Sequence, residues 1–171
     1  MCAGGEPNDE LAKQAGLACD RGILVDIDGR TSNPCVFAIG DVSRRPLSLH
    51  SDRMQRIESV QNAMEQAKQV SAAILGLPRP EPEVAWFWSD QFDVKLKIAG
   101  LSVDPDEIIL RGSPSSDAFS VLHLRQGALI CVETVNMTAD FMASKKIIAR
   151  GNKLSAAALL DTQIPLKALV V

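Results

Sequence analysis

Hydrophobic positions in the first half of the chain predict a short strand and a long helix, which are separated by a polar stretch. A short apolar run at 36–39 ends in Gly40 and predicts a buried strand. Residues 43–54 are polar and show no sustained period, so they predict a loop. The following residues predict an amphipathic helix of about five turns that ends at Gly76. Its apolar face is formed by Ile57, Val60, Ala63, Met64, Ala67, Val70 and Ile74.

Smaller elements and a linker complete this half. Residues 9–15 have helix-forming composition, and residues 23–26 predict a strand. Pro78, Pro80 and Pro82 alternate after the long helix, which favours an extended linker. A domain boundary is therefore expected there, between residues 1–80 and residues 81–171.

The second half has the alternating pattern of strands. Five runs are separated by turn residues such as Gly100 and Gly127, at 84–88, 94–99, 107–111, 119–124 and 128–136. They predict an antiparallel sheet of about five strands. Two helices are expected after it, at 138–149, capped by Thr138, and at 155–160. The predicted fold class is α+β.

Composition narrows the class of protein. The 171 residues are 46% hydrophobic and 23% charged, as in ordinary globular proteins. The sequence contains no apolar run long enough for a membrane span and no signal pattern, so a cytoplasmic, membrane-free protein is expected. The net charge of −3 argues against nucleic-acid binding. No metal site is expected, because Cys2, Cys19, Cys35 and Cys131 form no Cys-x-x-Cys pair.

Candidate chemistry gathers around two segments. Asp41 follows a glycine at the end of the predicted buried strand, where a carboxylate accepts hydrogen bonds from ligand hydroxyls or caps the next turn. The helix start near Val60 offers free N–H groups to a partner that gains negative charge. Trp86 and Trp88, the only tryptophans, share one face of a predicted strand, as a ligand cover or as core aromatics.

Four arginines lie close together between residues 44 and 56. A solvated polar loop explains them, and steering of an acidic partner is the functional alternative. They are Arg44, Arg45, Arg53 and Arg56.

Four segments in this order and spacing resemble the C-terminal part of the FAD-dependent, NADH-oxidising ferredoxin reductases, the putidaredoxin reductase and rubredoxin reductase group. They are Gly4 with Pro7-Asn8, Thr31 to Asp41, Ile57 to Ala63, and Trp86 to Gln91. The resemblance implies a partial FAD-domain segment at 1–80 followed by a reductase C-terminal domain at 81–171. Members of this family carry two Gly-x-Gly-x-x-Gly fingerprints, and this sequence has neither.

The resemblance also implies roles for individual residues. Gly40, Asp41, Ser59, Val60 and Trp88 are expected to bind FAD, with Asp41 on the ribityl chain. Glu58 and Trp88 are the expected catalytic residues, beside the flavin or nicotinamide. Since the ADP fingerprint is missing, FAD binding by the chain itself is expected to be weak or absent.

The implied activity is electron transfer from NADH through FAD to a [2Fe–2S] ferredoxin of an oxygenase system. The resemblance leaves a homodimer open. A second hypothesis stands beside it, namely that the chain is a folded interaction or dimerisation module without chemistry of its own.

Overall fold

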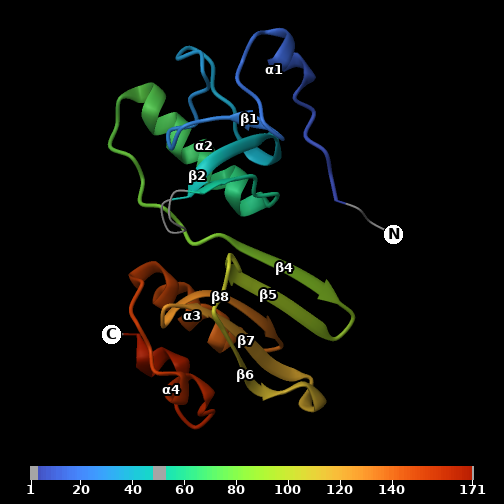
Figure 1. Cartoon of the computed structure of the whole chain (residues 1–171), viewed down its shortest axis with the longest axis vertical. Coiled ribbons are helices and arrows are strands. Elements are labelled where there is room, and N and C mark those ends of the chain that lie inside the picture. The colour runs from blue at the N-terminus through green and yellow to red at the C-terminus, as the bar shows by residue number, and fades with distance from the viewer. Residues whose placement is uncertain (1–3, 48–52, 171) are drawn as a thin grey trace. The chain divides into compact units, whose positions relative to one another are not determined.

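The computed structural model describes residues 4–47 and 53–170. The chain forms two compact units, residues 1–83 and residues 84–171 (Figure 1). The boundary predicted after residue 80 lies close to this division, and its status as a domain boundary stays a prediction. No helix among the described residues is long and apolar enough to span a membrane.

The first unit contains two helices and a small sheet of order β1-β2-β3. Helix α1, Glu10–Gln14, begins after Asp9 as the composition predicted. Strand β1, Ile23–Leu24, runs parallel to β2, Ser43–Leu47, and β2 runs antiparallel to β3, Arg53–Gln55.

The prediction of a loop at 43–54 is wrong, because the segment contains β2 and the first two residues of β3. Ser43, Arg45 and Leu47 alternate inward and are buried, as strand residues should be. Two of these three residues are polar, so the strand period is invisible to hydropathy. Residues 48–52 of the predicted loop lie outside the described residues.

The long helix exists as predicted but begins later and faces the other way. Helix α2, Val60–Leu75, starts after the N-cap Ser59 and ends at Gly76 in the left-handed conformation. Its buried residues are Asn62, Glu65, Gln66, Gln69 and Ala72. Val60, Met64 and Ile74 of the predicted core face are instead 59%, 57% and 63% exposed.

Hydrogen bonds explain why a polar face is turned inward. Gln66 Oε1 accepts from the backbone N–H of Gly40 at 2.6 Å and from Asn62 Nδ2 at 3.3 Å. Gln66 Nε2 donates to Ser43 Oγ at 2.8 Å, and Arg45 donates to Glu65 at 2.6 Å. Buried polar groups are stable only when paired in this way.

The predicted buried strand at 36–39 is also wrong. In the described part of the chain this segment has one isolated bridge, between Arg30 and Phe37. Val36 is 37% and Ile39 is 40% exposed. A run that is apolar at every position suits a strand covered on both faces, and this segment has no such cover among the described residues.

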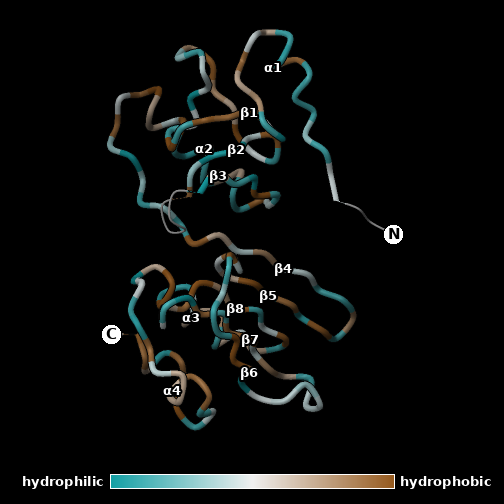
Figure 2. The backbone as a smooth tube through the Cα atoms, viewed as in Figure 1, coloured by the Kyte–Doolittle hydropathy of each residue, from teal (hydrophilic) through white to brown (hydrophobic). Residues whose placement is uncertain are grey.

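The second unit is built on a five-stranded antiparallel sheet of order β4-β5-β8-β7-β6, which confirms the predicted sheet. Figure 2 shows hydrophobic residues interleaved with hydrophilic ones along the strands. Leu122, Leu124 and Val132, on the two central strands β7 and β8, have no exposed surface. The strands are β4 Trp86–Gln91, β5 Val94–Gly100, β6 Glu107–Ser113, β7 Ala118–Arg125 and β8 Ala128–Val135.

Two helices pack on this sheet, as predicted. Helix α3, Thr138–Arg150, packs against β8 and β5, and α4, Ala156–Leu160, packs against β6. The N-cap of α3 is Met137 and makes no side-chain cap hydrogen bond, so the prediction of a Thr138 cap is wrong.

Candidate functional site

The first unit contains a cavity of about 670 Å³ beside the start of α2. A neighbouring hollow of about 580 Å³ shares Asp41 and Glu58 with it, so the two form one groove. This volume is in the range of small-molecule sites. The groove brings the predicted residues Asp41, Glu58, Ser59 and Val60 to one place.

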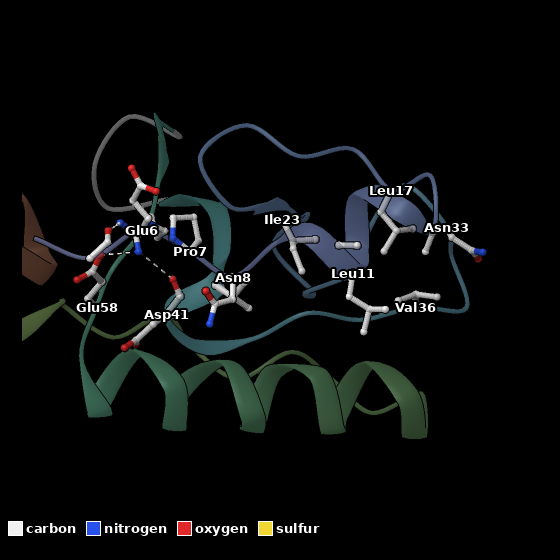
Figure 3. Close-up of a pocket in the computed structure, with 15 residues that line it drawn as sticks. Glu6, Pro7, Asn8, Leu11, Leu17, Ile23, Asn33, Val36, Asp41 and Glu58 are labelled. Atoms are coloured by element: carbon white, nitrogen blue, oxygen red, sulfur yellow. Dashed lines mark hydrogen bonds and ion pairs between the residues drawn. The ribbon is translucent and has the colours of Figure 1, made fainter.

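The cavity has an apolar end and a polar end (Figure 3). Leu11, Leu17, Ile23 and Val36 gather at the first, whereas Asp41 and Glu58 lie at the second. Such a cavity suits an elongated ligand with an apolar part and a hydroxyl-rich or charged part.

Gly40 and Asp41 stand on a short 3₁₀ turn, Gly40–Val42. Gly40 has a φ of 74°, a conformation that disfavours any side chain, and its buried N–H is held by Gln66. Asp41 is exposed, and its side chain points toward the first turn of α2 (Figure 3). The turn thus presents a solvent-accessible carboxylate to the groove, as the ligand hypothesis for Asp41 requires.

Glu58 lies at the same polar end as Asp41 and forms an ion pair with Arg56. Arg56 also donates to the backbone oxygens of Asp41, at 3.3 Å, and Gly5, at 2.7 Å. Arg56 therefore ties three segments of the groove together. The sequence did not single out this role, because the residue was grouped with three other arginines.

The start of α2 carries two buried oxygens without a hydrogen-bond partner. Ser59 Oγ accepts from the N–H of Asn62 at 3.2 Å, and Asn62 Nδ2 donates to Ile57 O at 2.9 Å. Gln61 Oε1 and Asn62 Oδ1 remain unpaired. Neither Gln61 nor Asn62 lines the cavity or the neighbouring hollow, so these two oxygens are not part of the candidate site.

The outward face of α2 is apolar along the groove. Val60, Ala63, Met64 and Ala67 line the second hollow, and Val60 and Met64 are more than half exposed. Exposed apolar surface of this kind marks a binding face more often than a free one. The predicted core residues of the helix thus form part of the candidate site.

The tryptophan pair belongs to the second unit. Trp86 and Trp88 lie on the same face of β4, with ring centroids 5.7 Å apart. Trp86 also packs edge-on against Phe141 at 5.7 Å, and Lys145 lies over its ring. Trp88 is 47% exposed. Trp86 is therefore a packing residue, and Trp88 is the tryptophan free to contact another molecule.

The arginines of 44–56 are not a solvated cluster. Arg45 is buried against Glu65 and Gln69, and Arg44 forms an ion pair with Asp20.

Among the described cysteines, Cys35 is exposed and Cys131 is buried. Burial raises the pKa of the Cys131 thiol to about 12, so the free thiol is a poor nucleophile. Cys2 lies outside the described residues.

Sequence reasoning missed the apolar end of the cavity. The helix that contains Leu11 was predicted, but the 80% exposure of Leu11 at the cavity was not. Ile23 was predicted only as a strand residue and not as part of a site. An isolated leucine on the outer face of a short helix was the available signal, but it is weak, because single exposed apolar residues are common.

Comparison with known proteins gives two family matches. A family model described as "Reductase C-terminal" matches residues 86–170. A second, described as "Pyridine nucleotide-disulphide oxidoreductase", matches residues 1–67. The two matches cover most of both structural units.

Curated relatives agree with these matches. The chain is 50% identical over its whole length to a probable ferredoxin reductase of Castellaniella defragrans, of which it covers 42%. It is 43% identical over 96% of its length to putidaredoxin reductase of Pseudomonas putida, covering 39% of that protein. The chain thus spans about two-fifths of the length of these relatives.

Solved structures show the same fold. The reductase in a covalent putidaredoxin reductase–putidaredoxin complex superposes with a TM-score of 0.94 at 41% identity, over 98% of this chain and 40% of that one. A ferredoxin reductase from Rhodopseudomonas palustris gives 0.92 at 37% identity, over 99% and 42%. By sequence and by fold, this chain is similar to part of the FAD-dependent ferredoxin reductases, and its second unit matches the Reductase C-terminal family model.

Proposed function

We propose that this chain acts as part of an oxidoreductase that passes electrons from NADH through FAD to a [2Fe–2S] ferredoxin. The observation that carries the proposal is the groove of the first unit, which combines an apolar body, the Asp41 carboxylate and the N-terminus of α2. The names of the relatives support it, since they are ferredoxin and putidaredoxin reductases. The cytoplasm is the proposed location.

Five residues of this chain would hold FAD. Asp41 would accept hydrogen bonds from the ribityl hydroxyls, and Gly40 would allow the close backbone approach. Ser59 and Val60 would set the N-terminus of α2 against the flavin ring, with Glu58 nearby at the polar end of the groove. Trp88 is proposed from its exposed ring and from the family resemblance.

FAD, when bound, supplies the exchange between two-electron and one-electron transfer, which protein side chains cannot perform. The residues of this chain contribute position and electrostatics. The helix end at Val60 favours negative charge on whatever lies against it. The outward apolar face of α2 would keep water from that side of the ring. Glu58 is proposed as a catalytic residue because it lies at the polar end of the groove, where it forms an ion pair with Arg56.

A chimera tests the proposal. This chain would replace the part of the C. defragrans relative that it matches. The alignment with that relative covers the whole of this chain. The chimera should purify with bound FAD and reduce a [2Fe–2S] ferredoxin with NADH. The chain alone should bind FAD weakly or not at all, because no Gly-x-Gly-x-x-Gly fingerprint is present to hold the pyrophosphate. Submicromolar affinity in equilibrium dialysis would overturn that expectation.

Asp41→Ala should weaken FAD retention by the chimera. Losing a charged acceptor for hydroxyl groups costs about 1.5–3 kcal/mol, or about 10–150-fold in affinity. The fold should survive, since the Asp41 side chain is exposed. Flavin absorbance per protein after dilution and gel filtration measures the effect, with the exposed Glu81→Ala as control. Full occupancy in Asp41→Ala would show that this carboxylate does not hold the flavin.

Trp88→Ala should slow reduction of ferredoxin by the chimera about tenfold while hydride transfer from NADH to flavin changes much less. Tryptophan is enriched among the few interface residues whose truncation costs more than about 1 kcal/mol. Stopped-flow measurement of both half-reactions separates the two steps. Ile108→Ala, which removes another exposed apolar side chain from the edge strand β6, is the control.

The outcomes of the Trp88 experiment are distinct. A collapsed hydride-transfer rate with normal ferredoxin reduction would assign Trp88 to the nicotinamide side. Equal loss of both rates together with a lower unfolding temperature would make it a packing residue like Trp86.

The second hypothesis, a non-catalytic interaction or dimerisation module, is favoured by the exposed apolar face of α2, which includes Met64 and Ile74. It predicts a colourless chimera that still folds. Light scattering of the chain at several concentrations would show whether this face forms a homodimer.

A further inference from the structure

Three potential metal ligands meet on one face of the five-stranded sheet. His123 on β7 lies directly opposite Cys131 on β8, and Glu133 follows Cys131 two positions later. Residues opposite each other in an antiparallel pair and residues two apart on one strand share a face. The ring nitrogen, thiol sulfur and carboxylate oxygen of these residues all lie within 4.8 Å of one another.

The His123 imidazole is held in a position to bind an ion. Its Nδ1 lies 3.0 Å from Ser102 Oγ, which fixes the ring orientation. Its Nε2 is buried, faces Glu133 Oε1 at 3.4 Å, and has no hydrogen-bond partner. His123 as a whole is only 8% exposed. A buried ring nitrogen that makes no hydrogen bond although a thiol and a carboxylate lie close by requires an explanation.

We propose that His123, Cys131 and Glu133 bind a zinc ion. An imidazole nitrogen, a thiolate and a carboxylate are all ordinary zinc ligands, and three of them leave one position of a tetrahedral ion for water. Binding releases the Cys131 thiol proton to solvent, so the ion gains a thiolate ligand. The ion also gives Nε2 of His123 the partner that it lacks.

The surroundings have the features of a built site. With Nε2 on the ion, Nδ1 of His123 carries the proton and donates to Ser102 Oγ, the outer hydrogen bond that zinc-binding histidines normally make. Cys131 is 1% exposed, whereas the Glu133 side chain is 43% exposed. An ion would therefore enter from the Glu133 side.

The site was expected to be absent because the sequence contains no Cys-x-x-Cys pair. His123 and Cys131 are separated along the chain by the tight turn at Gln126 and Gly127, and only the β7–β8 register brings them together. Ligands of this kind, facing each other across two strands, have no linear motif.

Titration of the metal-free chain with cobalt(II) tests the proposal, since cobalt occupies zinc sites and reports thiolate ligation by a charge-transfer band. The chain should bind one equivalent with this band, and zinc chloride should displace it. Cys131→Ser should abolish the band, and Ser102→Ala should weaken binding about 10–100-fold. Cys35→Ser, which removes an exposed thiol, should change nothing.

Three results would overturn the proposal. One is the absence of a saturable band from the folded chain. Another is an unchanged band in Cys131→Ser. Because a change at a buried cysteine can unfold the unit, His123→Gln and the half-exposed Glu133→Gln are tested beside it, with folding checked by tryptophan fluorescence. Both should lower zinc affinity by at least tenfold in proteins that remain folded, and unchanged affinity in both would also refute the site.

Discussion

Arg111→Met should lower the free energy of unfolding of the second unit by about 3–5 kcal/mol, the usual cost of breaking a buried ion pair. The Arg111 side chain is 3% exposed and pairs with the buried Asp140 at 3.1 Å. Its Nη1 and Nη2 atoms also donate to three backbone oxygens, of Leu159 in α4 and of Asp161 and Ile164 after it, at 2.7–2.9 Å. Methionine keeps most of the volume but leaves one carboxylate and three carbonyls without this donor.

Urea unfolding followed by tryptophan fluorescence measures this effect. Trp86 and Trp88 are the only tryptophans and both lie in the second unit, so the signal reports that unit alone. Lys146→Met, at an exposed position of α3, is the control and should change stability by less than about 0.5 kcal/mol. An Arg111→Met midpoint equal to that of the control would show that the Arg111 network does not stabilise this unit.

Arg45→Met should destabilise the first unit by a similar amount, about 3–5 kcal/mol. Arg45 donates to Glu65 at 2.6 Å and to Gln69 at 2.9 Å, and both acceptors lie on the inward face of α2. Removing the guanidinium leaves the buried Glu65 charge without its counterion. Helix α2 should then loosen from β2, and FAD retention by the chimera should fall with it.

The two arginine variants have distinct signatures. Far-ultraviolet circular dichroism should detect the Arg45→Met transition, whereas the tryptophan signal should stay near that of the wild type. Replacing Glu65 with Gln in the same chain should restore part of the stability, because the uncompensated charge disappears. No recovery in the double variant would show that the loss has another origin, such as the packing of the arginine stem.

The second unit could be predicted because its strands are short apolar runs separated by turn residues. The turns at Pro114–Ser116 and Gly127 separate β6, β7 and β8. Leu122, Leu124 and Val132 of the central strands are buried within the unit, so hydropathy reports these strands directly.

The first unit could be predicted only in part because its inward faces are polar. Gln66 and Arg45 are buried through hydrogen bonds that join residues twenty or more positions apart. No local period reveals such a network. The same reason explains why the apolar face of α2 was mistaken for a core face, although it lines the candidate groove.

The candidate site was predictable where a short motif carries it. Asp41 and Ser59 were expected to bind a ligand because they lie in the family motif, and both line the same hollow of the structure. Arg56 and the apolar end at Leu11 were missed, since their roles depend on contacts between distant segments.

The flavin content of the folded chimera is decisive for the proposed role of this chain. We predict a yellow protein that carries about one FAD per chain and reduces a [2Fe–2S] ferredoxin when NADH is added. A chimera that folds, as judged by its circular dichroism and cooperative unfolding, but remains colourless after reconstitution with excess FAD would contradict that role.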